Sequence, residues 1–122
     1  MVEKRLMVLA DFPEERWPSM DLCAEMLVRH LTAEQDQHFR VCRWCPPFRH
    51  RLDRLPILKK RAFNADRLIN RFWDYPRALR ARVGCFDLFH IADHSYSQLA
   101  LALPPGRTGV FCYDLDAFRC LL

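Results

Sequence analysis

Short apolar runs alternate with amphipathic stretches along this chain of 122 residues. The runs at 6–10, 39–44, 86–92 and 108–113 predict strands of a parallel sheet, which is buried on both faces. Between the first two runs, apolar residues recur at helical spacing from Ser19, the expected N-cap, to about position 33. This alternation predicts an α/β fold, a Rossmann-like parallel sheet with helices on both faces.

A second helical pattern covers about residues 64–82 and is interrupted by Pro76. Proline removes a hydrogen bond from a helix interior, so Pro76 predicts a kink or the start of a second short helix. Four apolar residues share one face of this pattern: Leu68, Phe72, Tyr75 and Leu79. We interpret four aromatic residues as core: Trp44, Phe72, Trp73 and Tyr75. Residues 46–61, with three prolines, are expected to be irregular.

Polar residues directly follow three of the predicted strands. They are Asp11 after the first strand, Asp93–Ser95 after the third and Tyr113–Asp114 after the fourth. Right-handed crossovers bring the carboxyl ends of parallel strands to one edge, where open α/β sheets bind ligands. We therefore expect these side chains to line a crevice. The alternative is that Asp93 and Asp114 only cap the helices that follow. Ser95 with Gln98 also matches a capping box, which predicts a short helix there.

The composition predicts one globular domain over residues 1–122. Hydrophobic residues make up 51% of the chain and only 3 are glycine, which argues against disorder. The apolar run at 6–10 is too short for a signal peptide, and we expect a cytoplasmic protein without a membrane span. Because the sequence ends on apolar residues 118–122, in what reads as a starting helix, we expect a chain truncated at its C-terminus.

The spacing of Cys42 and Cys45 is that of a redox or zinc motif. Pro46 and Pro47 follow directly, whereas a thioredoxin-like site places the motif at a helix start. A zinc site needs a second ligand pair, and the sequence has none at close spacing. We interpret these thiols as packing at a strand end and expect neither a metal nor a cofactor.

Basic residues are concentrated between Arg49 and Arg82, where 11 Lys and Arg face 3 Asp. Three interpretations stay open. The segment is a solvated face, or it attaches the protein peripherally to an anionic membrane surface, with Phe63, Phe72 and Trp73 at headgroup level. The third interpretation is nucleic-acid binding, which the sequence favours least because no recognised module is present.

Four segments carry a resemblance to a known family: residues 6–10, the amphipathic helix after the first loop, residues 86–94 and residues 110–115. Together they resemble the N-terminal domain of GT-B glycosyltransferases, in particular glycosyltransferase family 4. The resemblance covers nearly the whole chain. It implies an acceptor-side domain, for a glycan or a lipid-linked acceptor, that faces a second Rossmann-like domain holding the nucleotide-sugar donor. It also implies a transfer that retains the anomeric configuration and usually needs no metal.

The resemblance assigns catalysis to Tyr113 and Asp114. It assigns substrate binding to five residues: Asp11, Arg16, Asp93, His94 and Ser95. The loop at 11–18 lacks the family's glycines, and Tyr113 stands where the family often has His. A phenol ionises only near pH 10, so this exchange changes the available chemistry. We expect a sugar transferase domain that is inactive alone. The alternatives are a non-catalytic remnant or interaction module, and a basic binder of membranes or nucleic acid.

Overall fold

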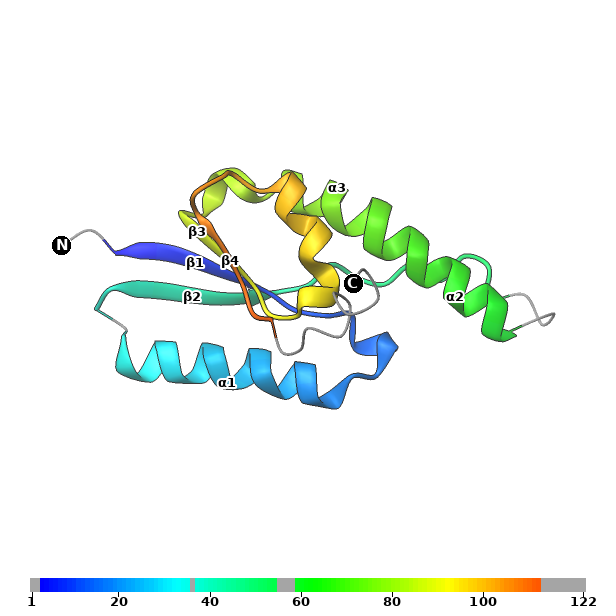
Figure 1. The fold of residues 1–122 in the computed structure, drawn as a ribbon, viewed down its shortest axis with the longest axis horizontal. Coiled ribbons are helices and arrows are strands. Elements are labelled where there is room, and N and C mark those ends of the chain that lie inside the picture. Colours follow the sequence, from blue (N-terminus) through cyan, green and yellow to red (C-terminus); the bar gives the residue numbers. More distant parts are fainter. Residues whose placement is uncertain (1–2, 36, 55–58, 113–122) are drawn as a thin grey trace, which may run out of the picture.

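The computed structural model describes residues 3–35, 37–54 and 59–112, and its four strands form a single parallel sheet (Figure 1). The strands are β1 (Lys4–Leu9), β2 (Phe39–Trp44), β3 (Leu88–Ile91) and β4 (Thr108–Val110). Their order is β2-β1-β3-β4. In the register of the sheet, Leu6 of β1 lies opposite Val41 of β2 and Leu88 of β3. The predicted parallel sheet is therefore confirmed.

Helices cover both faces of this sheet, as predicted. They are η1 (Pro13–Glu15), α1 (Pro18–Glu34), α2 (Lys59–Ile69), η2 (Asn70–Asp74), α3 (Tyr75–Arg80), η3 (Val83–Cys85) and η4 (His94–Ala102). In Figure 1, α1 lies below the sheet, and α2, α3 and η4 lie above it. We call α2, η2 and α3 together the rod, since they follow one another without a break.

Alternate residues of β1 serve the two halves of the core, since side chains of a strand point to opposite faces. Met7 and Leu9 pack in the cluster that includes Tyr75 of the rod. Val8 packs in the other cluster, with Ala24 of α1. Burial on both sides explains why the sequence of β1 is continuously apolar. No helix within the described ranges combines the length and apolar character that crossing a bilayer requires.

The rod differs from the predicted helix in which of its side chains face the core. Element η2 is a π-helical turn, in which the N–H of Tyr75 donates to the carbonyl of Asn70, five residues earlier. Each extra residue turns a helix by about 100°. Tyr75 is consequently fully buried, whereas Phe72 and Trp73 are 57% and 64% exposed. The interpretation of Phe72 and Trp73 as core is wrong. The π turn also relieves the clash that Pro76, in the first turn of α3, has with the preceding helical turn.

The predicted capping role of Asp93 is confirmed, because Asp93 is the N-cap of η4 and its carboxylate accepts the N–H of Ser95 at 2.9 Å. The capping box expected to start at Ser95 is wrong, and so are two other predicted helix starts. Helix α1 begins at Pro18, one residue before the expected cap Ser19, since the fixed φ of proline suits the first helical position. Helix α2 begins at Lys59, inside the segment expected to be irregular.

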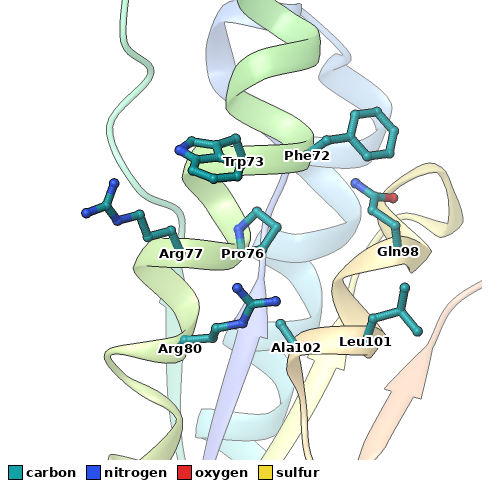
Figure 2. Close-up of a pocket in the computed structure, with 8 residues that line it drawn as sticks. All are labelled: Phe72, Trp73, Pro76, Arg77, Arg80, Gln98, Leu101 and Ala102. Atoms are coloured by element: carbon teal, nitrogen blue, oxygen red, sulfur yellow. The ribbon is translucent and has the colours of Figure 1, made fainter.

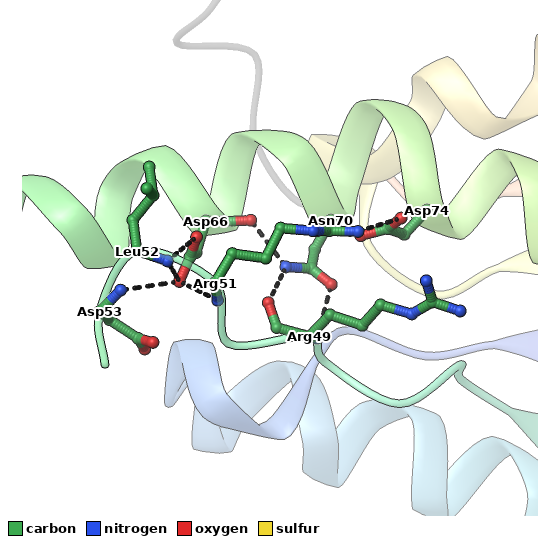
Figure 3. A network of polar contacts seen from close by, with 7 residues as sticks. All are labelled: Arg49, Arg51, Leu52, Asp53, Asp66, Asn70 and Asp74. Carbon is green, nitrogen blue, oxygen red and sulfur yellow. Dashed lines mark hydrogen bonds and ion pairs between the residues drawn. The ribbon is translucent and has the colours of Figure 1, made fainter. Parts of the chain in front are cut away.

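The irregular segment before α2 is tied to the rod by polar side chains of the rod (Figure 3). Asn70 accepts the N–H of Arg49 at 2.8 Å, and Asp74 forms a bidentate ion pair with Arg51. Three backbone N–H groups donate to the buried carboxylate of Asp66: those of Arg51, Leu52 and Asp53. Burial raises the pKa of Asp66, but these backbone hydrogen bonds together outweigh burial and lower the pKa.

Candidate functional site

Asp11 and Asp93 meet at the carboxyl edge of the sheet, where the direction of winding reverses. Asp11 follows β1, from which the chain turns to α1 on one face. Asp93 follows the neighbouring strand β3, from which the chain turns to η4 on the other face. Such a switch point is where open α/β sheets bind ligands. The predicted placement of Asp11 and Asp93 at one edge of the sheet is confirmed, but the two residues are only 3% and 5% exposed, so they do not line an open crevice as predicted.

The two carboxyl groups share one proton at neutral pH. Burial is the main cause that raises the pKa of Asp11 to about 9, and the hydrogen bond to Asp93 and the charges of Asp93 and Glu15 add to it. Burial also raises the pKa of Asp93, but hydrogen bonds from Asp11 and Ser95 outweigh it and lower that pKa. Asp11 is therefore the protonated partner and Asp93 the charged one.

Beside this pair, the fully buried side chain of Glu15 lies in an ion-pair network with Arg71, which is 10% exposed, and Arg67, which is 34% exposed. Arg71 forms two bonds to it, Nε to Oε1 at 2.6 Å and Nη2 to Oε2 at 2.7 Å. Arg67 Nε donates to Oε1 at 2.9 Å, and the hydroxyl of Tyr96 donates to Oε2. The guanidinium carbon of Arg71 also lies 4.2 Å from the centroid of the Tyr96 ring. Four hydrogen bonds from three side chains thus hold Glu15 in place.

This network sets the protonation of its members. Burial lowers the pKa of Arg71, but its hydrogen bond to Glu15 and its electrostatic interactions with Tyr96 and Glu15 together outweigh burial and raise the pKa. Burial, and then the hydrogen bond to Glu15, raise the pKa of Tyr96. Arg71 therefore stays charged and Tyr96 stays a neutral donor at physiological pH. We call Asp11, Glu15, Arg71, Asp93 and Tyr96 together the rim cluster.

Sequence reasoning missed three members of the rim cluster. Glu15, Arg71 and Tyr96 are not among the predicted site residues. Arg71 carried a usable signal, since it lies four residues before the buried Tyr75 and so on the same side of the rod. For Tyr96 the signal is its position three residues after Asp93, one turn into η4.

The other predicted site residues lie around this cluster. His94 is partly exposed, with Nδ1 at 3.8 Å from the Asp93 carboxylate. Ser95 is exposed beside it. Arg16 is exposed and has φ of +57°, in the left-handed region that favours glycine, at the place where the sequence lacks the family's glycines. Tyr113 and Asp114 lie outside the described residues.

Cys45, the second cysteine of the Cys42–Cys45 motif, is not an activated thiol. Burial, followed by the charges of Glu14 and Asp11, raises the pKa of Cys45 to about 12. At neutral pH this thiol is therefore protonated and a poor nucleophile or metal ligand. In the part of the chain that the structure describes, no group of three or more His, Cys, Asp or Glu side chains is placed to hold a metal ion.

Comparisons with protein-family models, with curated proteins and with solved structures give no match to this chain. The chemistry available at the rim cluster is therefore the guide to function. The proton of Asp11 is engaged by Asp93, so the pair offers a ligand only hydrogen-bond acceptors. A hydroxyl can donate to such an acceptor, so it matches the pair formed by Asp11 and Asp93 better than an anion does.

Proposed function

We propose that this chain is the acceptor-side domain of a retaining sugar transferase, with the acceptor hydroxyl held beside Asp11, Asp93 and His94. The observation that carries the proposal is the carboxyl pair at the switch point between β1 and β3. Asp93 accepts a hydrogen bond from the acceptor hydroxyl, and the proton of Asp11 stays in its hydrogen bond to Asp93. By the resemblance, Tyr113 and Asp114 act at the same edge, and the nucleotide-sugar donor lies on a second domain.

The charge of the rim supports a neutral acceptor rather than a donor diphosphate on this side. Asp93 carries a negative charge at the switch point. The nearby cations Arg71 and Arg67 both already donate to the carboxylate of Glu15. A diphosphate at this position would therefore meet repulsion without a free basic partner among the members of the rim cluster. A hydroxylated acceptor pays no such electrostatic penalty.

A second candidate function is a non-catalytic interaction module that uses the same fold. It is favoured by the burial of the rim cluster, since Glu15 is fully buried and Asp11 is only 3% exposed. On this interpretation the cluster serves only to fix η1 and η4 against the rod. The two candidates differ in whether the rim cluster responds to a ligand.

Two-dimensional ¹H–¹⁵N correlation NMR spectra of the purified chain distinguish these two candidate functions. A set of methyl glycosides and short glycans is expected to shift the amide signals of residues 11–16 and 93–96, and nucleotide-sugars are expected not to shift them. Asp93→Asn should abolish the glycan shifts. Asp87→Asn is the matched control, because Asp87 lies at the other end of β3, where it accepts the N–H of Arg5. Spectra unchanged by every sugar, or equal losses in both variants, would favour the interaction module.

A further inference from the structure

Three large apolar side chains project into solvent from the rod and from η4, which packs against α3. Their exposed fractions are 57% for Phe72, 64% for Trp73 and 90% for Leu101. Figure 2 shows Phe72 and Trp73 on the rod and Leu101 across from them on η4, beside a groove of about 450 Å³. We call this surface the outer face. Clustered exposed apolar side chains of this kind mark interaction sites on proteins.

The charges of the outer face have one sign. Arg77 and Arg80, one turn apart on α3, line the groove together with the apolar residues. The two carboxylates of the rod, Asp66 and Asp74, are buried and hold the segment before α2 (Figure 3), and neither lines the groove, although Asp74 lines a separate pocket with Arg77. Element η4 has no acidic residue. The outer face, as far as the structure describes it, therefore combines cations with apolar side chains and has no carboxylate to balance them.

We propose that the outer face binds the surface of anionic phospholipid membranes. Trp73, Phe72 and Leu101 enter the interface between headgroups and acyl chains, and Arg77 and Arg80 contact the lipid phosphates. Aromatic and aliphatic side chains flanked by cations are the pattern of proteins that lie on a membrane surface. Cations near the surface are attracted by anionic headgroups in addition. The proposal uses no residue of the rim cluster, so it stands or fails separately from the proposed function.

Two other occupants fit this face less well. A second copy of the chain would bring Arg77 and Arg80 against the same cations, which repel. A small ligand needs walls that enclose it, whereas Leu101 at 90% exposed stands clear of its neighbours. An extended lipid surface needs only side chains that protrude together, and it supplies the negative charge that the outer face lacks.

Co-sedimentation of the purified chain with vesicles tests the proposal. The chain is expected to bind vesicles that contain phosphatidylglycerol and not vesicles of phosphatidylcholine alone. Arg77→Glu with Arg80→Glu should weaken binding roughly tenfold or more, since each cation near the surface contributes separately. Arg29→Glu with Arg40→Glu is the matched control, because it makes the same change in net charge at two exposed side chains, on α1 and β2. Circular dichroism confirms that each variant is folded.

Quenching of tryptophan fluorescence by brominated lipid tests the geometry. Quenching is expected in the original chain and should be largely lost in Trp73→Phe, while binding persists. Equal binding to neutral vesicles, or equal weakening by the two double variants, would overturn the proposal. So would an acidic peptide that binds the outer face while anionic vesicles do not, since that outcome assigns the face to a protein partner.

Discussion

At Asp11 the fold changes the charge state of a side chain. An aspartate in the unfolded chain ionises near pH 4, whereas burial beside Asp93 raises the pKa of Asp11 to about 9 in the folded chain. Unfolding therefore releases a proton between these two pH values. It follows that the contribution of Asp11 to stability is greatest below about pH 4 and declines as the pH rises towards 9.

Asp11→Asn removes this dependence, because an amide is neutral at every pH. We expect the free energy of unfolding of the variant, relative to the original chain, to rise with pH across that window by up to about 1.4 kcal/mol per pH unit. Urea unfolding at several pH values measures the difference. A difference that stays constant with pH would show that Asp11 is charged in the folded protein.

Among the residues of the rim cluster, Glu15 is the one whose removal should lower the free energy of unfolding most. Glu15→Ala leaves Arg71 buried without its partner, and loss of one member of a buried pair destabilises proteins by about 3–5 kcal/mol. Glu25→Ala breaks the exposed pair with Arg29 and should change stability by less than about 1 kcal/mol. Urea unfolding of both variants tests this. Similar losses for the two would mean that the buried pair contributes no more than a surface pair.

The sequence allowed Asp11 and Asp93 to be located because their positions depend only on where strands end. It did not reveal Glu15 or Arg71. Charged side chains are usually exposed, so neither residue stands out by its type. Their partnership joins positions 56 residues apart, which no local pattern encodes. Residues placed by local rules could be predicted, and residues placed by a distant partner could not.

At the scale of elements, strands followed their pattern more closely than helices did. A strand buried on both faces needs a continuous apolar run, which β1 has, whereas β2 is a partly exposed edge strand with two arginines. Both strands lie within two residues of their predicted bounds. The rod kept the helical period only up to η2. Its π turn changed which side chains face the core, and no periodic template contains that extra residue.

Asp66 shows how one helical residue orders a segment without secondary structure. Asp66→Ala removes the acceptor of three backbone N–H groups and should lower stability by roughly 3 kcal/mol. Asp66→Asn, which keeps one oxygen, should lose about half as much. Urea unfolding compares both with Asp87→Ala, which removes the acceptor of the Arg5 N–H at an exposed position. An Asp66→Ala loss no larger than that of Asp87→Ala would contradict the structural role.

The contribution of Asp66 to stability changes with pH in the opposite direction to that of Asp11. Because the pKa of Asp66 is lowered in the folded chain, its contribution is present above about pH 4. It is lost as the pH falls through the folded value. The difference in the free energy of unfolding between the original chain and the Asp66→Asn variant should therefore become smaller at acidic pH.

For the whole molecule, the order β2-β1-β3-β4 decides where a ligand can bind. The alternating pattern predicts parallel strands, but it does not say which strands are neighbours. Only the assembled sheet brings the ends of β1 and β3 together. The parallel sheet was therefore predictable from the sequence, whereas the place at which its winding reverses was not.

This arrangement leads to a prediction about activity. The chain alone should release no sugar from a nucleotide-sugar, because a leaving diphosphate must be stabilised by positive groups and the Arg71 guanidinium is engaged by Glu15. Incubation with several nucleotide-sugars, followed by measurement of the free nucleoside diphosphate, tests this. Release that disappears in Asp93→Asn would contradict it.

The π turn has a consequence for how this segment can vary. Arg71 and Phe72 are neighbours in the chain, yet one reaches the buried Glu15 and the other reaches solvent. Deleting any one residue of 70–74 restores an ordinary helical turn and rotates everything before it by about 100° relative to α3. Single substitutions in the rod can be absorbed locally, but a change of length displaces Asp66 and Asn70 from the backbone that they hold. Variation in this segment is therefore limited in length more strictly than in composition.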